Sequence, residues 1–344
     1  MWIDTRVVAG AVRRCAQQLG EWRPGRGAGR DSVPDSLVRR SLAIMWYGLA
    51  GLWLVDGLLQ LQPEMFSMDM VSQIMQPTAI AQPGWITGPV NWTISLWSAA
   101  PAFWNATVAI LELAIAFGML IRGRAYWWGR AALWVSIGWG LVIWYLGEGL
   151  GGLFTGAATF VSGAPGSVIL YVAVAAILLI PERHWTNGRL FSTLRSGTGG
   201  LWLLGAALQF APVYWTPFGL STMLQSVAMM KQPLHLSSLD YSLVNAMGAA
   251  PVAWNLALII IMGTLGLALL TGRDGWLIYT LAGAFLLFLW GPCQGFGMIF
   301  TGMTTDPNTP PLLALLMVPC ALASWHSSRS VRSKLPVLRQ ALNV

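Results

Sequence analysis

Three acidic residues of this sequence lie in strongly apolar stretches. Asp56 follows Leu-Trp-Leu-Val, Glu112 lies between two leucines, and Glu148 follows Trp-Tyr-Leu-Gly. A carboxyl group in apolar surroundings is costly to ionise, so such groups are candidates for binding and releasing protons. We therefore predict that Asp56, Glu112 and Glu148 form a proton relay and are the catalytic residues of any reaction here. The alternative is that Asp56 and Glu112 are buried, protonated and hydrogen-bonded to neighbouring helices, and that Glu148 is a solvated loop residue.

The composition explains why acids in these positions are informative. Hydrophobic residues make up 56% of the chain and charged residues 10%, whereas a soluble domain carries about 25% charged residues. The mean hydropathy is +0.60. Such a chain has too few polar residues to cover a surface in contact with water. Apolar and polar residues do not alternate along it, which argues against a membrane β-barrel. The predicted fold class is an all-α, polytopic membrane helical bundle.

The elements that must position the acids are apolar stretches long enough, in most cases, to cross a bilayer. On such helices, at 1.5 Å per residue, Asp56 lies about 7 Å and Glu112 about 14 Å below the outer end. The eight predicted spans lie near 42–61, 103–121, 127–146, 167–180, 199–215, 253–271, 275–292 and 311–325.

The sequence also repeats itself. Three blocks recur in the same order, offset by 146 to 150 residues: 52–63 as 201–212, 101–105 as 251–255, and 144–156 as 290–302. We predict two four-helix units in the same orientation, because each holds an even number of spans. The predicted parts are a cytoplasmic Arg-rich tail (1–41), a first unit (42–181), a cytoplasmic linker (182–198), a second unit (199–326) and a basic tail (327–344).

The basic residues predict the topology. Of the 20 Lys and Arg residues, all but Lys231 fall in the tails, the linker or the short turns on one side. The positive-inside rule places that side, with both termini, in the cytoplasm, and we expect a bacterial inner membrane. Topology and contact with anionic lipid explain the net charge of +7, so no nucleic-acid partner is expected. The long outer loops are predicted to cap the bundle, with 65–75 and 223–230 as amphipathic interfacial helices.

The two copies differ at all three acids. Asp56 corresponds to Gly205, Glu148 to Gln294, and Glu112 to Ile261 or Met262 depending on register. Other polar and aromatic residues recur at the outer helix ends. They either cap helices or line an outer-leaflet cavity that binds a cofactor such as quinone. The residues of this predicted cavity are Gln60, Trp104, Asn105, Gln209, Trp254, Asn255 and Gln294.

Sulfur-containing residues offer a weaker candidate site. The spacing Met65-x-x-Met68-x-Met70 resembles that of thioether ligands for Cu(I), although methionine also fills interfacial helices without binding metal. No Cys/His spacing supports zinc. Cys293 and Cys320 lie near the outer halves of the last two predicted spans, and their pairing is left open.

One family resemblance is visible. The opening with Arg40 and Asp56-Gly57, and the run from Leu111-Glu112 to Gly118 and Arg122, resemble DoxX-type membrane proteins. The related DoxD proteins are similar to the quinone-reducing membrane subunit of thiosulfate oxidation. The resemblance implies a membrane subunit of a quinone-linked, thiosulfate- or thiol-type oxidoreductase with a separate redox partner. The alternatives are a transporter or channel for a small solute or metal ion such as copper, and a non-catalytic assembly partner. Whether the chain is an enzyme stays open.

Overall fold

The structure, a computed structural model, describes residues 33–122, 127–186 and 188–342. Every regular element in these residues is helical, so the all-α class is confirmed. The long helices are α2 (Asp35–Leu59), α5 (Pro101–Arg122), α6 (Trp127–Leu146), α7 (Ser167–Leu179), α8 (Arg189–Leu208), α11 (Pro251–Leu270), α12 (Trp276–Phe288) and α13 (Thr309–Leu342). We call α2 to α7 the first half and α8 to α13 the second half.

Six helices in the described residues are long and apolar enough to cross a membrane: α2, α5, α6, α11, α12 with its π-helical extension η6 (Leu289–Cys293), and the first part of α13. The protein is therefore a multi-pass membrane protein. The other two predicted spans are not confirmed. Helix α7 has 13 residues, about 20 Å at 1.5 Å per residue. Helix α8 carries Arg189 and Arg195 in its first two turns.

Three helices extend into predicted tails or linkers. Helix α2 begins at Asp35, directly after Pro34. A proline at this position costs no hydrogen bond within the helix, because its missing N–H would have no partner there. Helix α8 begins at Arg189 inside the predicted linker, and α13 continues to Leu342 through the predicted C-terminal tail. Most of the predicted N-terminal tail lies outside the described residues.

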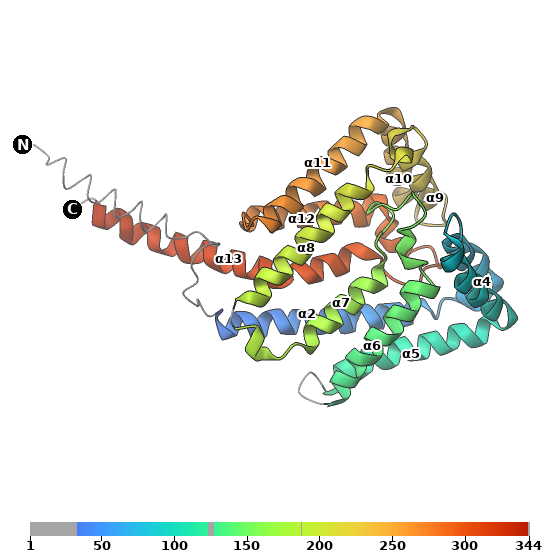
Figure 1. Cartoon of the computed structure of the whole chain (residues 1–344), viewed down its shortest axis with the longest axis horizontal. Coiled ribbons are helices and arrows are strands. Elements are labelled where there is room, and N and C mark those ends of the chain that lie inside the picture. The colour runs from blue at the N-terminus through green and yellow to red at the C-terminus, as the bar shows by residue number, and fades with distance from the viewer. Residues whose placement is uncertain (1–32, 123–126, 187, 343–344) are drawn as a thin grey trace, which may run out of the picture.

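The long helices run roughly side by side (Figure 1). Helix α2 packs mainly on α5, α8 mainly on α11, and α13 packs against α2, α7 and α8. At the crossing of α2 and α13 the backbone approach is close: a Cβ on Gly48 would lie 2.6 Å from Leu315 Cδ1. The core contains large fully buried side chains of α2, such as Met45, Leu49 and Trp53.

Each half also carries a set of further helices at one end of the bundle, which we call its lid (Figure 1, right). The first lid consists of η1 (Pro63–Phe66), η2 (Met70–Met75), α3 (Gln76–Thr78) and α4 (Gly84–Ala99). The second consists of η5 (Pro212–Trp215), α9 (Gly219–Ala228) and α10 (Leu234–Ala249). The short helices η3 (Leu150–Gly152), η4 (Glu182–His184) and η7 (Gly295–Met298) lie in the remaining connections.

The candidate thioether residues lie in the first lid. Met65 and Met70 belong to a small apolar cluster with Met75 and Val71, whereas Met68 is half exposed. The three side chains therefore do not share one environment. Copper binding by this run stays a prediction.

Matching hydrogen bonds occur in the two halves. The Asn105 side-chain amide donates to the Gln60 carbonyl at 2.7 Å, and Asn255 donates to the Gln209 carbonyl at 3.0 Å. These bonds join the end of the first helix of each half to the helix that follows the lid. The indole N–H groups of Trp144 and Trp290 each donate at 2.8 Å to a proline carbonyl, that of Pro165 and of Pro307 respectively.

Candidate functional site

The two deepest acids of the predicted relay lie in neighbouring helices. Asp56 is in the last turn of α2 and Glu112 is in the middle of α5, and each is 3% exposed. Their carboxyl groups are close enough to interact electrostatically. The Tyr171 hydroxyl of α7 faces Asp56, and the Trp139 indole of α6 faces Glu112. Neither of these pairs reaches hydrogen-bond geometry.

Glu148 lies between two glycines just after α6 and caps the N-terminus of α7. Its Oε1 accepts hydrogen bonds from the Ser167 N–H at 3.0 Å, the Ser167 hydroxyl at 2.7 Å and the Val168 N–H at 3.3 Å. A carboxylate at this position also interacts favourably with the helix dipole. Its Oε2 is inaccessible to solvent and has no partner.

The surroundings of Glu148 place its titration near neutral pH. Burial raises the pKa of Glu148 to about 8, and the nearby Asp306 carboxyl contributes to the rise, while the hydrogen bonds from Ser167 and Val168 oppose it. A carboxyl group that changes charge in this range can exchange protons under physiological conditions.

The structure adds a fourth acid, Asp306, from the second half. It lies in the connection before α13, where Asp306 Oδ1 accepts from the Asn308 N–H at 2.7 Å and Oδ2 from the Thr305 hydroxyl at 3.0 Å. Burial raises its pKa. Its charge acts on Asp56, Glu112 and Glu148. Its neighbours Thr305, Pro307 and Asn308 are typical of a turn, so the sequence around Asp306 does not by itself place it beside the other acids.

We call Asp56, Glu112, Glu148 and Asp306 the acid cluster. In the described part of the chain none of the four forms an ion pair with a basic side chain, and no group has the arrangement of a metal site. Several buried polar atoms in the cluster and beside it have no hydrogen-bond partner. They are Asp56 Oδ1, Glu112 Oε2, Glu148 Oε2, Tyr171 OH and Trp139 Nε1.

The matching place in the second half is apolar. Met262 follows Asn255 by seven residues, as Glu112 follows Asn105, so the structure favours Met262 over Ile261 as its counterpart. A Cβ on Gly205, the counterpart of Asp56, would lie 2.8 Å from Met262 Sδ and 3.0 Å from the Phe160 ring. Phe160 belongs to the first half, and its ring centroid lies 6.1 Å from that of Trp202.

At the lid end, connecting segments of each half pack against the other half, an arrangement that we call loop exchange. The Gln294 amide donates to the Phe160 carbonyl at 2.9 Å, and the Thr309 hydroxyl donates to the Gly163 carbonyl at 2.5 Å. The Thr304 N–H, in the connection before α13, donates to Gln62 Oε1, at the end of the first helix of the first half, at 3.4 Å. Asp306 of the second half therefore lies beside the acids of the first half, and Phe160 of the first half lies beside Gly205 and Met262 of the second.

Most residues of the predicted cofactor cavity make framework contacts. Gln209 donates to the Thr159 hydroxyl, and the Trp254 indole donates to the Ala246 carbonyl at 3.1 Å. Trp104 stacks on Trp97 at 5.7 Å between centroids. The amide oxygens of Gln60, Asn105, Gln209, Asn255 and Gln294 are buried without a partner. Cofactor binding by these residues stays a prediction.

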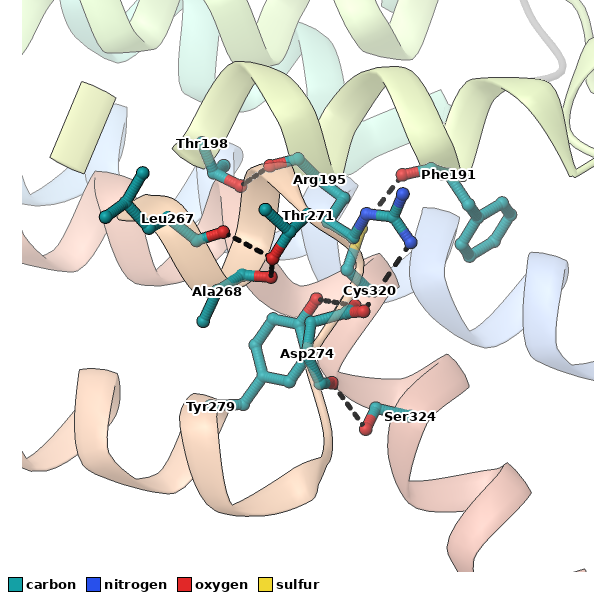
Figure 2. Close-up of polar contacts among 10 residues, drawn as sticks. All are labelled: Phe191, Arg195, Thr198, Leu267, Ala268, Thr271, Asp274, Tyr279, Cys320 and Ser324. Carbon is teal, nitrogen blue, oxygen red and sulfur yellow. Dashed lines mark hydrogen bonds and ion pairs between the residues drawn. The ribbon is translucent and has the colours of Figure 1, made fainter. Parts of the chain in front are cut away.

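A second polar cluster ties the opposite end of the second half together (Figure 2). Asp274, in the turn between α11 and α12, pairs with Arg195 of α8 at 3.5 Å and accepts from the Tyr279 hydroxyl at 2.8 Å. The Ser324 hydroxyl of α13 donates to the Asp274 carbonyl at 3.0 Å. Cys320 donates to the Phe191 carbonyl at 3.3 Å. Cys293 and Cys320 are both buried and free, so they do not pair.

Fold and site together define a multi-pass helical membrane protein with an acidic cluster at the junction of its two halves. Comparisons of the chain with protein-family models, curated proteins and solved structures found no match. The function is therefore inferred from the geometry of the site.

Proposed function

We propose that this protein moves protons between its lid end and the middle of the membrane through the acid cluster. The observation that carries the proposal is the convergence of four carboxyl groups with no basic partner among the described residues. Carboxyl groups this close in a low-dielectric site repel one another when ionised, so their ionisation is coupled and the cluster favours bound protons. Ionisable groups of this kind inside membranes are characteristic of proton and ion pathways.

The order of the acids supports a path inward from the lid end. Asp306 and Glu148 lie in connections outside the long helices, whereas Asp56 and Glu112 lie within α2 and α5. In this path a proton passes from the Asp306 and Glu148 pair to Asp56 and then to Glu112. The Tyr171 hydroxyl faces Asp56 and can accept one proton while donating another. Both termini are proposed to be cytoplasmic, so that the lids face outward.

In the redox form of the proposal, the protein is the membrane subunit of a quinone-linked oxidoreductase, as the DoxX-type resemblance implies. A quinone takes up two electrons and two protons, and in this form a partner subunit supplies the electrons. Two buried donors without acceptors, the Tyr171 hydroxyl and the Trp139 N–H, fit the carbonyl oxygens of a quinone. The acids then supply the protons.

A second candidate function is proton- or cation-coupled transport of a small solute. The observation that favours it is the loop exchange, because a site closed by both halves changes its access when the halves move relative to each other. In this form the two halves are copies of one four-helix unit. The acid cluster is then the coupling site rather than a source of protons for chemistry.

The proposal is tested with purified protein in phosphatidylcholine vesicles that contain a pH-sensitive dye. In the transport form, an imposed proton gradient should drive proton flux in the wild type that is lost in Glu112→Gln, with Met262→Leu as the matched control. A second assay measures quinone reduction by native membranes containing wild-type, Glu112→Gln or Asp56→Asn protein. Flux in the isolated protein favours transport, whereas an effect on quinone reduction alone favours the redox form. If Glu112→Gln equals the wild type in both assays, the relay is wrong.

A further inference from the structure

The lids expose large apolar side chains to an unusual degree. On the first lid Trp85 and Trp92 are 55% and 62% exposed, and on the second Phe218 and Leu234 are 75% and 85% exposed. Contiguous apolar surface of this kind marks contact with a membrane or with another protein. Proton transfer through the acid cluster does not require this surface, so it needs an explanation of its own.

The lids carry few charged residues: Glu64 and Asp69 at the start of the first, and Lys231 and Asp240 in the second. Residues 70–111 contain no Asp, Glu, Lys or Arg, and residues 232–272 contain only Asp240. Asp240 is buried and accepts a hydrogen bond from the Gln232 amide at 2.7 Å. A surface in contact with water carries charged residues at about a quarter of its positions, so neither segment has the composition of a water-facing domain.

The exposed lid surface is continuous with a membrane-spanning surface. Helix α4 leads through Ala100 directly into the spanning helix α5, where Phe103 and Ile110 are 63% and 69% exposed. Helix α10 leads in the same way into α11. The apolar surface of each span therefore extends onto the helix before it without a charged break.

We propose that the two lids are embedded in the leaflet on their side of the membrane, with α4 and α10 in contact with lipid. A hollow of about 420 Å³ between α10 and the connection that contains η7 fits this occupant, because most of its lining side chains are apolar and suit a lipid acyl chain. Its lining residues are Pro233, His235, Leu236, Phe296 and Phe300. In this arrangement the exposed polar residues of the first lid, Asp69, Ser72 and Gln73, are expected to lie on the water side.

The test places single fluorescent labels on cysteines introduced in a Cys15→Ser background, since Cys293 and Cys320 are buried. Labels at Trp92→Cys and Leu234→Cys report on the proposed lipid surface. A label at Ser72→Cys, which is exposed but polar, is the control. The protein is reconstituted in phosphatidylcholine vesicles with and without phosphatidylcholine carrying a nitroxide on its fifth acyl carbon.

We expect the nitroxide lipid to quench the labels at positions 92 and 234 at least about twofold more than the label at position 72, with iodide in the water showing the reverse order. Strong iodide quenching at positions 92 and 234 overturns the proposal, because it places the lids in water. Protection from both quenchers in a dimeric or hetero-oligomeric particle also overturns it, because a protein then covers the surface. Unchanged elution of each variant as the wild-type particle excludes misfolding as the cause.

Discussion

The two halves of the bundle use the same framework to enclose opposite interiors. In each, an Asn after the lid bonds to the carbonyl at the end of the first helix, and a Trp indole bonds to a proline carbonyl. Inside that framework the first half holds Asp56 and Glu112 beneath Asp306. The second half holds Gly205 and Met262 beneath Phe160.

This difference separates scaffold from site. The second half shows that the framework closes well around apolar side chains, so the acids are not required for packing. Buried acids without basic partners are destabilising, and they persist in the first half together with an acid contributed by the opposite half. The comparison therefore points to function in the first half and to structural support in the second.

The largest expected effect separates the two halves by activity. Glu112→Gln removes a titrating carboxyl group but keeps its size, and we expect proton flux to fall by about 10² or more, the usual contribution of a positioned proton-transfer group. Met262→Leu changes the matching position of the second half without changing its polarity. Flux in that variant should stay within about twofold of the wild type, because volume-conserving apolar changes are well tolerated. Equal losses in both variants would contradict the functional asymmetry.

The next effect separates the halves by stability. Phe160 is 2% exposed and fills the second-half site, so Phe160→Ala should destabilise the protein by about 3–5 kcal/mol through the cavity it leaves. Asp306→Asn, at the corresponding closure of the first half, removes charge but little volume. Thermal unfolding in detergent should show a large fall in Tm for the first variant and a small change for the second. Similar falls would mean that Asp306 is as structural as Phe160.

A smaller effect tests how tightly the second half is closed. A Cβ on Gly205 meets both Met262 and Phe160, so Gly205→Ala should cost about 1–3 kcal/mol by overpacking. Gly263 is next to Met262 on the same helix, and a Cβ added there would have no neighbour within 4 Å. Gly263→Ala should therefore be neutral or stabilising by up to about 1 kcal/mol, because alanine favours the helix. A Tm for Gly205→Ala at or above that of Gly263→Ala would show that the closure is loose.

The sequence predicted the membrane class, the helical fold and the burial of Asp56 and Glu112, because composition and apolar context determine these features. It predicted spans over parts of α8 and over α7, but α8 carries two arginines and α7 is short, so neither is among the six helices long and apolar enough to cross a membrane. It missed Asp306 as a member of the cluster, because loop exchange between the halves depends on tertiary packing. It offered helix capping as one of two roles for the outer amides but could not name their partners, because those are carbonyls far away in the sequence, such as that of Phe160.

The smallest effect concerns the pH dependence at the entrance of the acid cluster. Burial raises the pKa of Glu148 to about 8 from its ordinary value of 4.5, so the protonated form is favoured in the folded protein. This contribution to stability is fully present below about pH 4.5 and is lost as pH rises through about 8. Glu148→Gln keeps an oxygen to cap α7 but cannot titrate, and in the second half Gln294 occupies the corresponding position. Between pH 5 and 8, the Tm of the wild type should fall more steeply than that of Glu148→Gln, with a difference equivalent to about 1 kcal/mol or more. Parallel Tm profiles would show that Glu148 is already ionised throughout this range, and the entrance of the relay would then have to be Asp306 alone.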